Sequence, residues 1–263
     1  MFSRGKLCGI FCVRRISLIS EDLVSAKKKH NDRRDFLGQL AGGAAALAGL
    51  GFAPPLFAAE AKAMQSPTAP GEWDDSWTKK LDGKKFKTVF DAPVVNSALA
   101  LHQANAVIDN YRDAVGVPAS DLGLVVVIRH RAIPMAFNDF VWEKYNAGVD
   151  LKLSDPTTGE PARRNPFLHV SKDDQHGLVG PNTSLQSLYD RGVIFLGCNN
   201  AAMGWAAMLA KKSGAKVDDV RAELKANLIP GMTLLPTGIF AVVRAGNVGC
   251  SYMPAWYKLS DEF

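Results

Sequence analysis

The stretch Val193-Ile194-Phe195-Leu196-Gly197-Cys198-Asn199-Asn200 decides the fold, because an apolar run rich in β-branched and aromatic residues passes here directly into a helical pattern. Such a junction is typical of a buried strand that feeds a helix. It places Cys198 at the carboxyl end of the strand and at the start of the helix. Backbone N–H groups and the positive end of the helix dipole favour a thiolate at that position. Cys198 is therefore the candidate nucleophile.

The segments on either side repeat this alternation of strand and helix. The ranges expected as strands are 87–91, 122–128, 193–197, 232–235 and 250–253. The ranges expected as helices are 96–112, 132–146, 184–190, 200–212, 217–226 and 239–245. Strand 122–128 is apolar throughout, as in a strand that is covered on both faces. The pattern predicts an α/β domain over residues 86–263, with an open, mainly parallel sheet of about five strands and helices on both faces.

Two segments do not follow the alternation. Residues 64–85 are polar and carry Trp73 and Trp77, and they are expected to form an N-terminal arm held by its two indoles, or a short docking turn. Residues 149–181 hold four prolines and three glycines and show no clear periodicity. An irregular insertion of this length is usually a functional lid, an interface or locally disordered.

The N-terminal region predicts export. Residues 31–38, Asn-Asp-Arg-Arg-Asp-Phe-Leu-Gly, resemble the twin-arginine motif, and an apolar stretch rich in alanine and glycine follows at 40–57. The glycines and the pair Pro54-Pro55 in this stretch favour a removable signal over a permanent membrane helix. We expect a presequence at 1–63, cleaved near Ala61 or Ala63, and a protein delivered to the periplasm.

Removing the presequence changes the charge balance. Residues 1–61 hold nine of the 31 Lys and Arg and five of the 26 Asp and Glu, which leaves 22 basic and 21 acidic residues. A nearly neutral domain gives no electrostatic argument for binding nucleic acid. Cys8 and Cys12 leave with the presequence, so Cys198 and Cys250 remain. Because Cys250 begins a strand and Cys198 ends one, a parallel sheet separates them too far for a disulfide, and Cys250 is expected to be buried packing.

Polar residues at the other strand ends are expected to share the sheet edge with Cys198. The candidate ligand-binding residues are Asp91, Asn96, His130, Arg131, Asn199, Asn200, Thr237 and Gly238. Arg131 or a protonated His130 near Cys198 would hold an anionic sulfur species. Each of these polar residues is equally well explained as a helix cap or a surface group, and Asn96 looks especially like an N-cap.

A metal or haem site is the less favoured alternative. It would have to combine His102, His169 or His176 with Met135 or Cys198, and the sequence has no CxxCH, HExxH or close Cys/His cluster. No GxxxxGK phosphate loop and no GxSxG elbow is present. We therefore expect no cofactor and no metal.

Three motifs in order carry a family resemblance. They are the strand ending in Cys198-Asn199-Asn200, the run 229–238 ending in Pro236-Thr237-Gly238, and the terminal Gly249-Cys250-Ser251-Tyr252. Together they resemble the DsrE/DsrF-like family of small α/β sulfur-relay proteins, in which the corresponding motifs are Cys-Gly-Asn, Pro-Ser-Gly and Gly-Tyr-x-Tyr. The chain departs from the family pattern at Asn199, Thr237 and Cys250.

The resemblance implies an open parallel sheet, an assembly of three or six identical subunits, and a cysteine that carries persulfide sulfur, the role that Cys198 would inherit. The function expected from it is the handling of sulfane sulfur or another thiol-reactive small molecule, with a small sulfur species or a thiol partner protein, and sulfurtransferase-type relay if the protein is an enzyme. One alternative is a non-enzymatic ligand-binding or accessory subunit of an envelope complex, favoured by the insertion and the tryptophan arm. A second is a haem or metal carrier.

Overall fold

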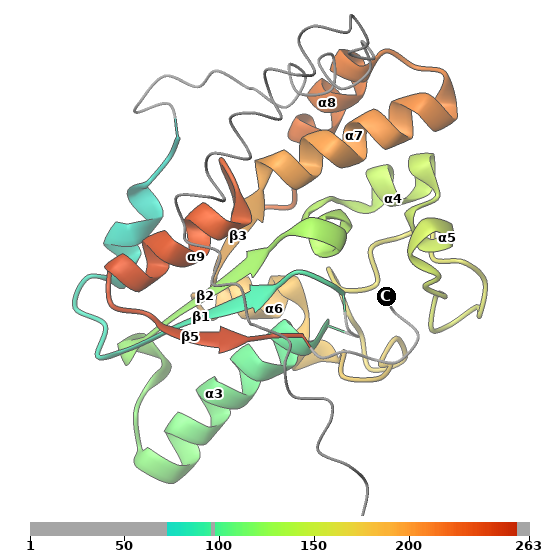
Figure 1. Cartoon of the computed structure of the whole chain (residues 1–263). Helices are drawn as coiled ribbons and strands as arrows, with labels where there is room; N and C mark the ends of the chain where they lie inside the picture. Colours follow the sequence, from blue (N-terminus) through green and yellow to red (C-terminus); the bar gives the residue numbers. More distant parts are fainter. Residues whose placement is uncertain (1–72, 96–97, 257–263) are drawn as a thin grey trace, which may run out of the picture. The chain divides into compact units, whose positions relative to one another are not determined.

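The computed structural model describes residues 73–95 and 98–256, and it confirms the expected α/β class with a five-stranded parallel sheet (Figure 1). The strand order is β4-β3-β2-β1-β5. The strands are β1 (Phe86–Ala92), β2 (Leu122–Ile128), β3 (Ile194–Cys198), β4 (Met232–Leu235) and β5 (Ser251–Pro254). The export motif, the apolar stretch 40–57 and the expected cleavage sites lie outside the described residues.

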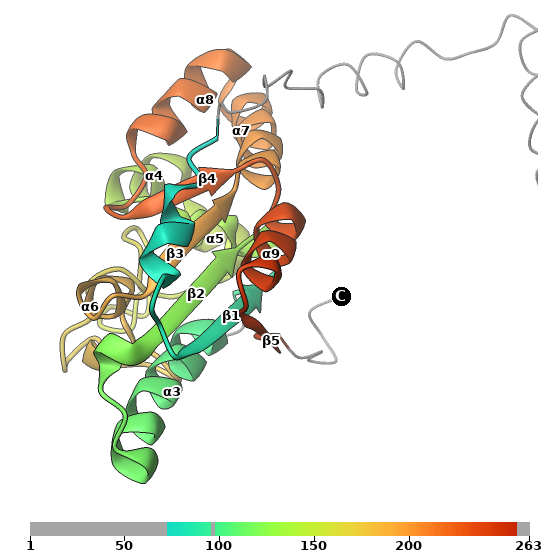
Figure 2. The same cartoon turned by 90° about the vertical axis from the view of Figure 1, so that its left-hand side faces the viewer.

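Both faces of the sheet are covered, which explains why β2 is apolar at every position. Side chains of a strand alternate between the two faces, so Val125 and Val127 contact one core while Leu124 and Val126 contact the other. Figure 2 looks at the face that α9 (Gly238–Asn247) and the 3₁₀ helix η1 (Ser76–Leu81) cover. The opposite face is covered by α3 (Leu99–Val115), α4 (Asp139–Tyr145), α6 (Leu185–Asp190), α7 (Asn199–Ser213) and α8 (Val217–Ala226).

The connections place all five strand ends at one edge. From β1 to β4 each strand pairs with the next in parallel, and the connecting helices lie on one face, as right-handed crossovers require. Helix α9 lies on the other face and returns the chain to β5, which pairs with β1. In open parallel sheets, the carboxyl edge of the strands is the usual place for a site.

The prediction of one helix over 132–146 is wrong. The chain forms a 3₁₀ helix η4 (His130–Ala136), an extended residue at Phe137, then α4 and the short α5 (Ala147–Leu151). Asn138 begins α4, because its side chain accepts a hydrogen bond from the Val141 N–H at 3.4 Å. Helix α3 also differs from the expected range 96–112, because it begins at Leu99 and continues to Val115. Asn96 lies outside the described residues.

The part of the N-terminal arm that the structure describes packs on the domain. Trp77 and Leu81 of η1 are each 1% exposed and belong to the core beneath α9. Arg244 of α9 donates to both carboxylate oxygens of Asp75, from Nη2 to Oδ2 at 2.6 Å and from Nε to Oδ1 at 3.2 Å. Within the described ranges, no helix combines the length and apolar character needed to cross a membrane.

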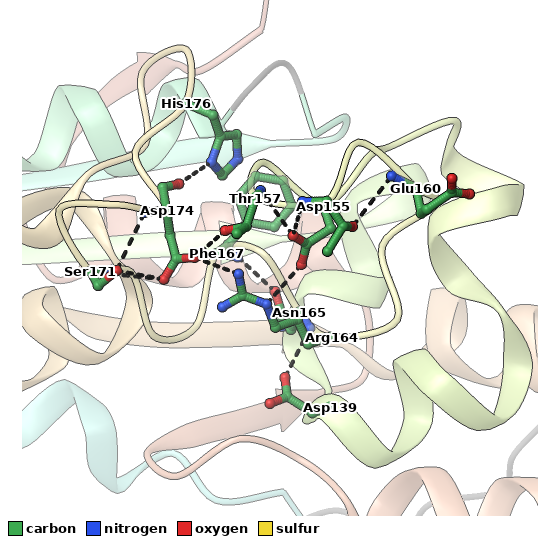
Figure 3. Close-up of polar contacts among 11 residues, drawn as sticks. Asp139, Asp155, Thr157, Glu160, Arg164, Asn165, Phe167, Ser171, Asp174 and His176 are labelled. Atoms are coloured by element: carbon green, nitrogen blue, oxygen red, sulfur yellow. Dashed lines mark hydrogen bonds and ion pairs between the residues drawn. The ribbon is translucent and has the colours of Figure 1, made fainter.

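Polar contacts order the insertion (Figure 3). Arg164 lies between two carboxylates, with Nε 2.8 Å from Asp155 and Nη2 2.5 Å from Asp174. Asn165, which is 2% exposed, donates from Nδ2 to the carbonyl oxygens of Met135 and Phe137 at 3.0 and 2.8 Å. The segment is irregular in backbone, as expected, but ion pairs hold it together and buried hydrogen bonds fix it to η4.

Candidate functional site

Cys198 lies where β3 ends and α7 begins. It is the N-cap residue of α7, and its Sγ accepts a hydrogen bond from the Ala201 N–H at 3.3 Å. The residue is 7% exposed and its thiol is free. A backbone N–H at a helix N-terminus stabilises negative charge on the acceptor that it faces. The residue is therefore nearly enclosed, and its sulfur faces a backbone N–H at the start of the helix.

An ion pair from the two neighbouring strands lies at the same edge. Arg129, the residue after β2, donates from Nε to Asp91 Oδ1 at 2.6 Å and from Nη2 to Oδ2 at 2.9 Å. The Asp91 side chain near the end of β1 is 5% exposed and that of Arg129 is 25% exposed. Tyr252 of β5 donates its hydroxyl to Asp91 Oδ2 at 3.0 Å. Asp91 thus fixes both the guanidinium and the phenol.

The guanidinium is a permanent cation within electrostatic range of the thiol. The hydrogen bond with Asp91 is the main cause that raises the pKa of Arg129, and the negative charge of Asp91 and electrostatic interactions with Tyr252 and Cys198 add to it. Burial, together with the hydrogen bond to Asp91, raises the pKa of the Tyr252 phenol, so this group remains a donor at neutral pH. Arg129 and Cys198 therefore interact electrostatically at this edge of the sheet.

Gly238, which follows β4 as the first residue of α9, lies against Arg129. A Cβ atom at this position would lie 2.5 Å from Cβ and 2.6 Å from Cδ of Arg129, distances that real Cβ atoms essentially never show. The stem of Arg129 therefore crosses the start of α9 where only a glycine leaves room. Thr237 is the N-cap residue of α9, with its Oγ1 accepting from the Phe240 N–H at 3.0 Å. Asp91, Arg129, Cys198 and Gly238 lie at or just after the carboxyl ends of β1 to β4, and Tyr252 is the second residue of β5.

The remaining residues that the sequence suggested for the site differ in their burial and in what they contact. Asn199 is buried, and its Oδ1 has no hydrogen-bond partner in the part of the chain that the structure describes. Asn200 is exposed, and its backbone N–H donates to the Pro236 carbonyl at 3.2 Å. His130 and Arg131 line a cavity of about 480 Å³ between η4, α5 and α7, and Cys198 does not line it.

Two residues of the cluster were missed as candidates. Arg129 belongs to the same run as His130 and Arg131, but an apolar strand pattern does not say which of its flanking cations turns toward the next strand. Tyr252 lies in the last motif of the sequence, and its role depends on β5 pairing with β1 at the register Val89↔Tyr252. The signal that could have found both residues is their position at or just after a strand.

Cys250 contrasts with Cys198. It directly precedes β5 rather than beginning it, is 9% exposed, and is also a free thiol. Burial raises the pKa of Cys250, with a smaller opposing influence from Lys87. A raised pKa makes a thiol less nucleophilic at neutral pH. Cys250 is therefore a natural internal control for the reactivity of Cys198.

The described residues contain no group of three or more His, Cys, Asp and Glu side chains that could hold a metal ion. His176, one of the histidines considered for such a site, has its Nδ1 2.8 Å from the carbonyl oxygen of Asp174. His102 lines a second cavity of about 580 Å³ beside the end of the insertion, together with glycines such as Gly177 and Gly180.

Comparison with known proteins gives a distant structural likeness. No family model matches the sequence, and no curated protein matches it. A solved structure from Methanobacterium thermoautotrophicum, described as a protein of unknown function, MTH1491, aligns with 64% of this chain and 98% of its own. The sequence identity is 15% and the TM-score is 0.32. The chain is thus similar at a distance to an uncharacterised protein, and this likeness carries no statement about function.

Proposed function

We propose that this protein handles sulfane sulfur through Cys198, which carries the sulfur as a persulfide. The observation that carries the proposal is the surroundings of the thiol, namely the Ala201 N–H 3.3 Å from Sγ and the cationic Arg129 in electrostatic range. Thiolates and persulfides are anions, so both features favour the reactive form of the cysteine and its product. The three motifs that resemble the DsrE/DsrF-like family support the same role.

The step is a thiol exchange. The Cys198 thiolate attacks a sulfane sulfur of a polysulfide, an S–S bond forms between them, and the S–S bond of the donor breaks. The shortened polysulfide leaves with the electron pair, and the protein keeps one additional sulfur. A second thiolate, from a small molecule or a partner protein, then attacks that sulfur and releases the Cys198 thiolate. Because Cys198 is 7% exposed, small donors are favoured over bulky ones.

Cyanide provides a test, because it removes sulfane sulfur from a persulfide as thiocyanate. We expect protein that has been treated with polysulfide and desalted to release about one thiocyanate per chain. Cys198→Ser should release none, and Cys250→Ser should release as much as the wild type. Equal release from the wild type and Cys198→Ser would overturn the proposal.

We further propose that the protein is a periplasmic homo-oligomer. The twin-arginine motif supports the location. Exposed apolar side chains on α9 support the assembly, since Ile239 is 69%, Phe240 44% and Val243 57% exposed, and a helix face of this kind is typical of a protein interface. Light scattering on the purified protein tests this, and a monomer at micromolar concentration would contradict it.

A second candidate is a non-enzymatic subunit of an envelope complex. Two observations favour it. Cys198 is almost completely buried, which limits the access of reactants to its thiol. The ordered, polar insertion offers a fixed surface to a partner protein. Maleimide labelling of the native protein separates the two candidates. Labelling at Cys198 supports sulfur handling, whereas complete protection of Cys198 favours the accessory role.

A further inference from the structure

The cavity between η4, α5 and α7 is a second candidate site. Its volume of about 480 Å³ lies within the range of small-molecule sites in proteins. Part of its wall is apolar and buried, formed by Ile133, Pro134, Ala147 and Trp205. Met208, which also lines the cavity, is 44% exposed. The cavity can therefore bury the apolar part of a ligand.

Helix α7 forms one long wall of the cavity. Ala201, Gly204, Trp205 and Met208 line it, a spacing that places all four on one face of the helix. At 1.5 Å per residue this wall is roughly 10 Å long, about the length of a two-ring aromatic molecule. A Cβ atom on Gly204 would meet no atom of the described residues within 4 Å. The missing side chain at Gly204 therefore leaves open space along this wall.

Contacts with neighbouring residues fix the apolar wall. The indole of Trp205 packs against Phe137, with the two ring centroids 5.4 Å apart. Trp142 of α4 donates from its indole Nε1 to the Pro134 carbonyl oxygen at 2.9 Å, which holds η4 in place. A cavity whose walls are already held in position needs little further ordering when a ligand binds.

The cavity also has a basic side. His130 and Arg131, the first residues of η4, line the cavity and are exposed. A guanidinium is a permanent cation with five N–H donors, so one contact with the protein leaves others for a ligand. The charge of Asp150, the acidic residue of the lining, is balanced, because its Oδ1 lies 2.5 Å from Lys212 Nζ. The other oxygen of Asp150, Oδ2, is enclosed by protein and is not accessible from the cavity.

We propose that this cavity binds a small aromatic molecule that carries one carboxylate group. The rings lie along α7 against Trp205, and the carboxylate accepts hydrogen bonds from the guanidinium of Arg131. A planar guanidinium matches a carboxylate in shape, and charge-assisted hydrogen bonds of this kind are the stronger ones. A ligand with several charges is disfavoured, because its other charges would lie against apolar walls. The site stands whether or not Cys198 carries sulfur, because Cys198 does not line the cavity.

The test uses the full chain labelled with ¹⁵N and the probe 2-naphthoate. The readout is the indole N–H resonance of Trp205, assigned by its loss in Trp205→Phe. We expect a saturable shift with a dissociation constant below about one millimolar. The probe 2-naphthamide has the same rings and nearly the same shape without the charge, and it should bind about tenfold more weakly. Absence of a saturable shift with 2-naphthoate, or equal affinity for the two probes, would overturn the proposal.

Arg131→Gln tests the cation. This variant should bind 2-naphthoate about tenfold more weakly than the wild type does, and 2-naphthamide with unchanged affinity. Lys211→Gln is the matched control, because it removes one positive charge from an exposed position on α7 that does not line the cavity. It should keep the preference of the wild type for 2-naphthoate. A preference that persists in Arg131→Gln, or that is lost equally in Lys211→Gln, would rule out the pairing of the carboxylate with Arg131.

Gly204→Leu tests the position of the rings, since its side chain fills the open space along α7 and should abolish the shift. Ala207→Leu is the matched control, because Ala207 is exposed on the same helix and does not line the cavity, and it should bind like the wild type. Equal binding of 2-naphthoate by the two variants would place the probe elsewhere and contradict the site.

Discussion

At the scale of single residues, the proposed reactivity of Cys198 depends on Arg129. Asp91, which also accepts a hydrogen bond from Tyr252, holds the Arg129 guanidinium in place, and the charge of Arg129 interacts with the thiol. Arg129→Met removes the cation with little change in side-chain length. We expect iodoacetamide to alkylate Cys198 about tenfold more slowly at pH 7, equivalent to about 1.4 kcal/mol. Mass spectrometry of the tryptic peptide that contains Cys198 measures the rate.

Arg131→Met is the matched control, because Arg131 stands on η4 and lines the other cavity. Its alkylation rate should equal that of the wild type. If Arg131→Met slows the reaction and Arg129→Met does not, the electrostatic partner of Cys198 has been assigned to the wrong cation. Thermal unfolding of both variants verifies that the comparison is made between folded proteins.

Gly238 offers a second test at this scale. In Gly238→Ala the new methyl group meets the stem of Arg129 at 2.5 Å and must displace it. We expect this variant to lose about 1–3 kcal/mol of unfolding free energy, as is usual for overpacking, and to alkylate as slowly as Arg129→Met. Chemical denaturation measures the first effect.

Gly246→Ala serves as its control on the same helix, where a Cβ atom meets no atom of the described residues within 4 Å. It should stabilise the protein by about 0.5–1 kcal/mol, because alanine has the higher helix propensity. A Gly238→Ala variant with the same unfolding free energy as the wild type would show that the stem of Arg129 does not need to cross the start of α9.

The residues of the site were partly predictable. Asp91, Cys198 and Gly238 could be placed at strand ends from the apolar runs alone, since a buried parallel strand is a continuous apolar segment. Arg129 could not be separated from Arg131, because both follow the same strand and only the three-dimensional path of η4 turns them toward different surroundings. The roles of Thr237 and Asn200 are local and need no ligand to explain them.

At the scale of elements, the insertion depends on ionised carboxylates. Hydrogen bonds from Arg164, the largest cause in each case, lower the pKa of both Asp155 and Asp174 below their ordinary values. A carboxylate with a lowered pKa in the folded state contributes stability above about pH 4 and loses it as the pH falls further. We expect hydrogen exchange in residues 153–176 to increase below pH 4 relative to exchange in β2.

Arg164→Leu is the control for this effect. The variant should exchange faster in the same segment already at neutral pH, and acid should change it less. An insertion whose exchange relative to β2 stays constant between pH 6 and pH 2.5 would contradict the view that Arg164 and its two carboxylates order it.

The elements themselves show what periodicity reveals. Long helices such as α7 and the apolar strands were predicted to within a few residues. The error at 132–146 arose because η4, α4 and α5 together present apolar residues at nearly helical spacing. The extended backbone at Phe137 and the cap at Asn138 interrupt them, and both depend on contacts with distant residues, including the hydrogen bond from the Asn138 N–H to the Asn227 carbonyl at 3.0 Å. A sequence window does not contain that information.

At the scale of the whole molecule, the segment before β1 is part of the fold. Trp77 is 1% exposed beneath α9 and fills the core on that face of the sheet. Trp77→Ala should lower the free energy of unfolding by about 3–5 kcal/mol, the usual effect of removing a buried aromatic side chain. Trp256→Ala, at a residue that is 44% exposed, is the control and should cost much less. Equal effects of the two substitutions would contradict the docked arrangement.

The architecture was predictable and the strand order was not. Alternating strands and helices predict a parallel sheet, since a crossover helix is the common way to join parallel strands. The choice of the edge beside β1 for β5 depends on α9 crossing the opposite face, which no local pattern specifies. The cavity beside α7 could not be predicted from the sequence either, because Gly204 and the two helices α5 and α7 form it only in the folded chain.

The measurement that tests the account most directly is the mass of each cysteine peptide after the native protein has reacted with polysulfide. We predict a gain of one sulfur, about 32 Da, on the peptide that contains Cys198, reversed by dithiothreitol, with no gain on the peptide that contains Cys250. An unmodified Cys198 in protein whose Cys198 reacts fully after denaturation, or a gain confined to Cys250, would contradict the claim that the end of β3 is a sulfur-handling site.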